Sequence, residues 1–155
     1  ADLGIVVAGF EAWDVDAEAM LDWLQKQAQQ GAMLGGISNG SFVLAQAGLL
    51  DGYAATAHWE DFSSFCERHP QVKARYQRFV IDGKRMSCSG GASTLDMGIE
   101  IVRHDLGDKI AQQVSRQMLL QDWAGPEKQG SQLIYDGSHN YSPRVQRILG
   151  LLDVG

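Results

Sequence analysis

Apolar and polar positions in the first third of the chain follow the period of a strand and then that of a helix. Residues 3–8 form a β-branched apolar run ending in Gly9, typical of a strand covered on both faces. Asp14 or Asp16 can cap the helix that is expected next, and Gly31 ends it. The apolar stripe of this helix is Met20, Trp23, Leu24 and Ala28.

The middle of the chain predicts shorter elements. These are strands over residues 32–37 and 53–58 and a helix over residues 40–47. Glu60 or Asp61 then opens a helix that must stop before Pro70.

The last predicted elements of the main unit are a hairpin and two helices. Residues 78–89 contain two extended arms around Asp82-Gly83, a strong hairpin signal. Ser93 and Asp96 resemble a capping box for a helix that runs to Gly107. A further amphipathic helix is marked by Ile110, Val114, Met118 and Leu119.

The pattern changes after residue 122. A polar, glycine- and proline-rich stretch predicts a loop, and Ser142-Pro143 begins a helix with an apolar stripe. We therefore expect a main domain over residues 1–122, and a loop and linker helix over residues 123–155.

Strands and helices alternate, which predicts an α/β fold with a mostly parallel sheet. Ligands of such sheets bind beyond the carboxyl ends of the strands. Gly9, Phe10 and the turn after residue 37 are expected at that edge.

Charge, cysteine content and the length of apolar runs exclude several classes of function. The net charge of −6 argues against direct DNA binding by this chain. Cys66 and Cys88 form neither a disulfide framework nor a metal-ligand pair, and they fit a reducing cytoplasm. No apolar run approaches the ~18 residues of a membrane span.

Gly36-Ile37-Ser38-Asn39-Gly40 has the G-x-S-x-G pattern of a nucleophile elbow, a tight turn from a strand into a helix. Ser38 as a nucleophile would need a histidine and an acid. The chain order allows Asp96 with His104 or His139, although neither histidine lies in an obvious catalytic loop. His58, at the end of a predicted strand, is better placed, but no acidic partner for it is evident. Alternatively, the glycines only permit a tight turn. We favour a third interpretation, in which Ser38 and Asn39 hold a ligand carboxylate at a helix N-terminus without catalysis.

Two other segments carry candidate site residues. His58 and Trp59 stand with Glu60 where a strand meets a helix; they are either core residues or a cage for a cationic group. Ser89 and Gly90 lie on the correct edge to line a pocket, while Cys88 is expected to be a small buried hydrophobe. The sequence has no metal-ligand spacing and no dinucleotide or Walker-type motif, so we expect no cofactor.

Two long stretches resemble a known family. GGISNGSFVLAQAGLLDGYAATAHWEDF and IDGKRMSCSGGASTLDMGIEIVRHDLGDKIAQQVSRQML are similar to AraC-type regulators with a PfpI-like sensor of the class I glutamine amidotransferase superfamily. The resemblance is nearest to the branch that senses carnitine, glycine betaine or arginine. It implies a flavodoxin-like three-layer α/β sandwich and an elbow whose enzymatic members carry cysteine where Ser38 stands. Gly9 and Phe10 would flank the pocket.

The resemblance also implies partners and missing parts. Additional N-terminal strand and helix units, and a C-terminal helix-turn-helix domain, are expected outside this chain. The chain would be an effector-binding, dimerising sensor of a cytoplasmic regulator that contacts DNA only through the absent domain. Its effector would be a quaternary amine or amino-acid derivative. The alternative is a PfpI- or amidase-like hydrolase that uses Ser38.

Overall fold

A computed structural model describes residues 2–9 and 18–120. Within them, the strands are β1 Leu3–Ala8, β2 Met33–Ser38, β3 Ala54–Ala55, β4 Lys73–Ala74, β5 Phe79–Asp82 and β6 Arg85–Cys88. The helices are α1 Glu18–Gln29, α2 Gly40–Gln46, α3 Phe62–Arg68, α4 Ser93–Leu106 and α5 Asp108–Gln117.

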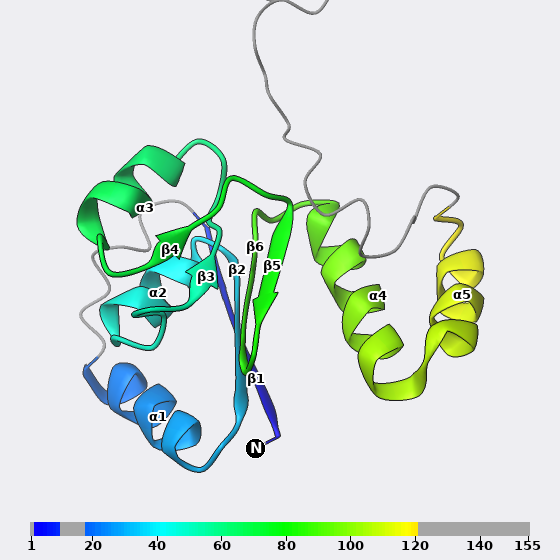
Figure 1. Cartoon of the computed structure of the whole chain (residues 1–155), viewed down its shortest axis with the longest axis horizontal. Helices are drawn as coiled ribbons and strands as arrows, with labels where there is room; N and C mark the ends of the chain where they lie inside the picture. The colour runs from blue at the N-terminus through cyan, green and yellow to red at the C-terminus, as the bar shows by residue number, and fades with distance from the viewer. Residues whose placement is uncertain (1, 10–17, 121–155) are drawn as a thin grey trace, which may run out of the picture.

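The described residues form a three-layer arrangement around one main sheet. Its strand order is β1-β2-β6-β5, and only the β5–β6 pair is antiparallel. Figure 1 shows α1, α2 and α3 on one side of the sheet and α4 and α5 on the other. The predicted mostly parallel α/β fold and the hairpin at Asp82-Gly83 are both confirmed.

The larger core lies between the sheet and the helices α1 to α3. Phe42, Leu34, Leu24 and Phe65 are buried there, with exposed fractions of 0–1%. A smaller cluster on the opposite face joins β5 and β6 to α4 through Phe79, Met86, Cys88 and Met97. The expectation of a buried Cys88 is therefore confirmed.

The prediction that β1 is covered on both faces is wrong for the described residues. Leu3, Ile5 and Val7 are exposed, Val7 by 71%. They point away from α1 and α2, and α4 contacts β5 and β6, at the far side of the sheet. β1 is an edge strand of the described sheet, so its apolar side chains lie on one covered and one open face.

The strand predicted over residues 53–58 is reduced to two residues, paired in parallel with β4. Two main-chain N–H groups of this segment donate to side chains of the main sheet. The N–H of Ala54 lies 2.8 Å from Asp82 Oδ2, and that of Thr56 lies 2.8 Å from Ser87 Oγ. Because side chains accept these hydrogen bonds, the segment lies against the hairpin without extending its strand ladder.

Two of the predicted helix stripes need correction. Trp23 is 48% exposed, since α1 packs through Met20, Leu21, Leu24 and Ala28. In α5, Met118 and Leu119 lie beyond the helix end and are exposed, while Ala111 and Ser115 are buried. Small residues form that buried face because α5 packs closely on α4.

The capping box expected at the start of α4 is also wrong. Ser93 is the first helical residue, and its hydroxyl donates to the carbonyl of Gly90 at 2.6 Å. Asp96 forms an ion pair with Arg78. The carboxylate therefore ties the helix to the segment before β5, and the helix extends to Leu106 as predicted.

No helix in residues 18–120 is long and apolar enough to cross a membrane. Phe10, the boundary at residue 122 and the linker helix lie outside the described residues.

Candidate functional site at the strand ends

The predicted elbow is present at the junction of β2 and α2. Ser38 has a φ of +57°, in the left-handed region that residues other than glycine rarely adopt. A Cβ at position 36 would lie 2.6 Å from the main-chain N of Ser41, and one at position 40 would collide with the carbonyl oxygen of Val6. Both glycines are therefore required for the turn to pack against the sheet.

The carboxyl ends of three parallel strands meet at this elbow. Ala8 of β1 is in register with Ser38, and Ile37 is in register with Cys88 of β6. Gly9 and Ser89, which follow β1 and β6, therefore lie at the same edge as Ser38. Gly90, which the sequence also predicted at this edge, lies close to Ser38, since a Cβ there would be 3.0 Å from Ser38 Cβ.

Asn39 is fixed behind the elbow and is only 1% exposed. Its main-chain N–H donates to the carbonyl of Ala8 at 3.1 Å, and its side-chain Nδ2 donates to Asp61 Oδ2 at 2.7 Å. Its Oδ1 is buried without a hydrogen-bond partner. Direct binding of a ligand by Asn39 stays a prediction, and it would require this buried side chain to become accessible.

The Asn39–Asp61 hydrogen bond connects the elbow to the segment that carries His58 and Trp59. Asp61 lies immediately before α3. The sequence predicted that it could begin this helix but did not predict its hydrogen bond to Asn39. The half-buried His58 has its Nδ1 3.7 Å from Glu60 Oε2, and its ring centroid is 5.7 Å from that of Trp59. Trp59 is 52% exposed, so it is not a core residue.

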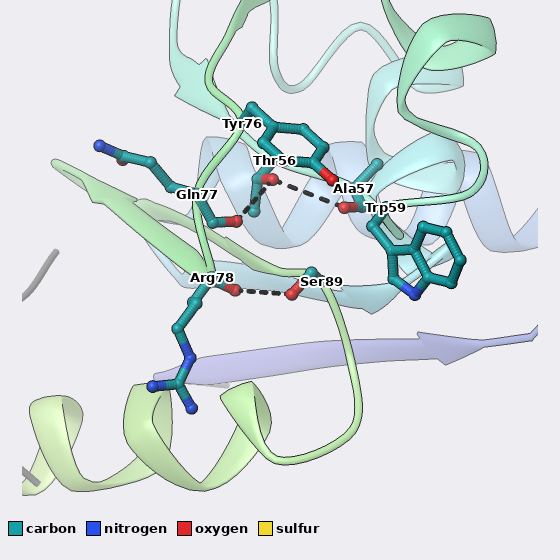
Figure 2. A pocket seen from close by; sticks show the side chains of 7 residues that line it. All are labelled: Thr56, Ala57, Trp59, Tyr76, Gln77, Arg78 and Ser89. Atoms are coloured by element: carbon teal, nitrogen blue, oxygen red, sulfur yellow. Dashed lines mark hydrogen bonds between the residues drawn. The ribbon is translucent and has the colours of Figure 1, made fainter. Parts of the chain in front are cut away.

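A hollow opens beside these residues, and the space in it, open solvent included, is about 260 Å³. Its lining consists of residues 56–57, Trp59, residues 76–78 and Ser89. Figure 2 shows the Tyr76 ring on one side, the Trp59 indole on another and Ser89 below them. Tyr76 was missed because its polar, basic neighbourhood shows no strand or helix period.

The remaining candidates for a catalytic triad are not brought together. Asp96 and His104 lie eight residues apart on α4, a rise of about 12 Å. His104 is exposed and its Nδ1 is 2.8 Å from Asp105 Oδ1. His139 lies outside the described residues. Of the described residues, Asp96 and His104 therefore do not form an acid–base pair for Ser38.

Neither cysteine occupies the elbow. Cys88 is buried in β6, with its Sγ 3.6 Å from Thr94 Oγ1. Cys66 lies on α3, where burial raises the pKa of its thiol and so disfavours the nucleophilic thiolate. The part of the chain that the structure describes also contains no group of three or more potential metal ligands from His, Cys, Asp and Glu.

Comparison with known proteins gives consistent matches. The model of the DJ-1/PfpI family matches residues 2–104. The HTH-type transcriptional regulator CdhR of Pseudomonas aeruginosa is 44% identical over 119 residues, 77% of this chain and 35% of CdhR. An isonitrile hydratase of Pseudomonas putida is 30% identical over 106 residues, 67% of this chain and 45% of the hydratase.

A solved structure supports the same fold. The crystal structure of an AraC family transcriptional regulator from Pseudomonas putida superposes with a TM-score of 0.70 and 30% identity. The match covers 76% of this chain and 63% of that one. These matches confirm the predicted flavodoxin-like α/β class. The chain spans about a third of the length of CdhR, at 35%.

Proposed function

The chain belongs to the DJ-1/PfpI family, and we propose that it senses a small effector for an AraC-type transcriptional regulator, without catalysis. The observation that carries this proposal is the elbow. Ser38 keeps the strained left-handed conformation that exposes a side chain at a strand end. In the enzymes that the sequence resembles, a cysteine thiolate occupies this position.

We place the effector between the elbow and the hollow beside it. The Ser38 hydroxyl would donate to the anionic end of a zwitterion, with Gly9 and Ser89 at the same edge. His58 and Trp59 would approach its cationic end, and Asn39 would hold the two regions together through Asp61. The effector class is a quaternary amine or an amino-acid derivative.

DNA binding and dimerisation belong to the complete regulator. A net charge of −6 disfavours phosphate contacts by this chain, so a separate domain would bind DNA. Effector binding would shift the balance between arrangements of those domains in a cytoplasmic homodimer. Similarity to named regulators supports this assignment.

The test compares Ser38→Ala with the unchanged chain by calorimetric titration with glycine betaine, carnitine and arginine. We expect one of these to bind and the substitution to weaken it about tenfold, the cost of one charge-assisted hydrogen bond. Equal affinity of both chains, or no binding of any of the three, would contradict the proposal.

The rival function is hydrolysis by Ser38, which similarity to an enzyme of the family keeps open. A fluorophosphonate probe distinguishes the two, because it labels an activated serine covalently. We expect no labelling of Ser38 by mass spectrometry. Labelling that disappears in Ser38→Ala would favour the hydrolase.

A further inference from the structure

Asp61 occupies the position from which a side chain normally caps α3. Aspartate is among the best residues there, because its carboxylate accepts from the N–H groups of the second and third helical residues. In α3 these are the N–H groups of Ser63 and Ser64. Asp61 has instead a φ of −99° and a ψ of 3°, and its side chain makes no capping hydrogen bond. The first turn of α3 therefore lacks the cap that its sequence could provide.

The elbow uses this carboxylate instead. Asp61 Oδ2 accepts from Asn39 Nδ2 at 2.7 Å, and the two residues are 22 positions apart in the sequence. The bond fixes the orientation of the Asn39 amide, because only the nitrogen of that amide can donate to a carboxylate. The amide oxygen is then buried without a hydrogen-bond partner.

This single contact leaves hydrogen-bonding groups unsatisfied in two places. A buried acceptor without a donor costs about 1–3 kcal/mol, and a missing helix cap costs about 1 kcal/mol. One charge-assisted hydrogen bond contributes about 1.5–3 kcal/mol and so offsets these losses only in part. The balance indicates that the Asn39–Asp61 bond serves position more than stability.

The bond joins the elbow to the turn that carries Trp59. The main-chain N–H of Asp61 donates to the carbonyl of His58 at 3.1 Å, which closes this turn. The body of α3 is held separately, by an edge-to-face contact of Phe65 with Phe42 of α2 at a centroid distance of 5.1 Å. A backbone change at Asp61 would therefore redirect the turn without displacing the helix.

We infer that Asp61 is a positioning residue of the effector site and that its carboxylate has two alternative positions. In the first, it binds Asn39 and holds the turn that carries Trp59 against the elbow. In the second, it caps α3, and the turn loses its link to the elbow. Capping requires an extended backbone at Asp61, whereas the observed ψ is 3°, so the two positions exclude each other. This inference rests on the proposed effector-sensing function and describes how that site is regulated.

Hydrogen exchange in the ligand-free chain, followed by NMR, tests this inference. Asn39→Ala removes the amide, so that Asp61 becomes free to cap α3. We expect the main-chain amides of Ser63 and Ser64 to exchange about fivefold more slowly, which is the effect of one cap. A contact with only a structural role predicts faster exchange, because its loss would loosen the helix. Unchanged or faster exchange at both amides would overturn the inference.

The matched control removes the carboxylate as well. In Asn39→Ala/Asp61→Ala, neither the elbow nor α3 can use the side chain at position 61. We expect exchange at Ser63 and Ser64 to return to the rates of the unchanged chain, or to exceed them. Slow exchange that persists in this double variant would show that Asp61 is not the cap, and would reject the two positions.

Exchanging the two side chains provides the rescue. Asn39→Asp places two carboxylates in contact, so Asp61 should leave the elbow and slow exchange in the first turn of α3 about fivefold. Asn39→Asp/Asp61→Asn restores one amide–carboxylate pair and should restore fast exchange. Equal rates in these two variants would overturn the inference, even if Asn39→Ala failed to fold.

These outcomes are separable from the Ser38 test. Effector binding that depends on Ser38, together with unchanged exchange in Asn39→Ala, would retain the sensor proposal and reject Asp61 as a positioning residue. Slower exchange in Asn39→Ala, without binding of any of the three amines, would reject the sensor proposal and retain the link between the elbow and α3.

Discussion

The elbow and the hollow lie side by side but are built in different ways. Backbone geometry fixes the elbow: two glycines permit close contacts, and the register of β1, β2 and β6 places it at the strand ends. The segments around the hollow are held by side-chain hydrogen bonds: Asp82 and Ser87 accept from main-chain N–H groups, and Thr56 donates to the carbonyl of Gln77. The shape of the elbow therefore follows from the backbone, whereas the hollow depends on polar side chains that substitution can remove one at a time.

Gly40→Ala should have the largest effect, because its Cβ would collide with the carbonyl of Val6 in the neighbouring strand. We expect a loss of about 3 kcal/mol in the free energy of unfolding, measured by urea denaturation. Gly98→Ala is the control: this α4 glycine has nothing within 4 Å of a Cβ, so the change should stabilise by about 0.5–1 kcal/mol. Similar losses of stability in Gly40→Ala and Gly98→Ala would show that the close contact at Gly40 does not constrain the elbow.

Ser87→Ala should come second and should act on the hollow. It leaves the buried N–H of Thr56 without its acceptor. We expect the free energy of unfolding, measured by urea denaturation, to fall by about 2 kcal/mol. Ser63→Ala, at an exposed position on α3, should change stability by less than about 0.5 kcal/mol. A stable Ser87→Ala would mean that this hydrogen bond does not hold the segment.

Ser38→Gly should be slightly stabilising while it weakens effector binding. Relief of a left-handed conformation is worth about 1–2 kcal/mol, and the extra backbone freedom of glycine costs about 0.5–1 kcal/mol. Ser38→Ala removes the same hydroxyl but keeps the strain, so the two variants separate conformation from ligand contact. A loss of stability in Ser38→Gly would argue against strain at the elbow.

The smallest effect concerns pH. Burial beside Phe42 and Phe65 lowers the pKa of His69 from its ordinary value of 6.5, with a further lowering by Arg68 and an opposing effect of Asp51. At this histidine the unfolded chain therefore binds a proton more readily than the folded chain. The contribution of neutral His69 to the free energy of unfolding is fully present above pH 6.5 and is lost as the pH falls below that value. His69→Leu should flatten the stability profile between about pH 8 and about pH 5. An unchanged profile would contradict this assignment.

The sequence predicted the elbow because its signal is local. Gly36, Ser38 and Gly40 lie within five consecutive residues, and the apolar run before them predicts a strand. The hairpin at Asp82-Gly83 was predictable for the same reason. Whether Ser38, Asn39, His58 and Ser89 contact a ligand stays a prediction, although the strand register does bring Ser38 and Ser89 to one edge.

Features that depend on distant partners were missed. Tyr76 reaches the hollow because Lys73–Ala74 pairs with Ala54–Ala55, and no period in the sequence indicates that pairing. Asp61 and Asp96 carry signals of helix starts, yet their carboxylates bond Asn39 and Arg78. The open face of β1 was missed because an apolar run does not reveal which of its faces a helix covers.

The attachment of residues 54–56 through side chains has a dynamic consequence. Their amides donate to Asp82 and Ser87, not to the β5–β6 ladder, so this wall can detach while the main sheet stays paired. The amides of Ala54 and Thr56 should then exchange with solvent through a local opening, well before those of β2. An effector that closes the hollow would slow exchange at these two amides and so report its binding to one wall of the site.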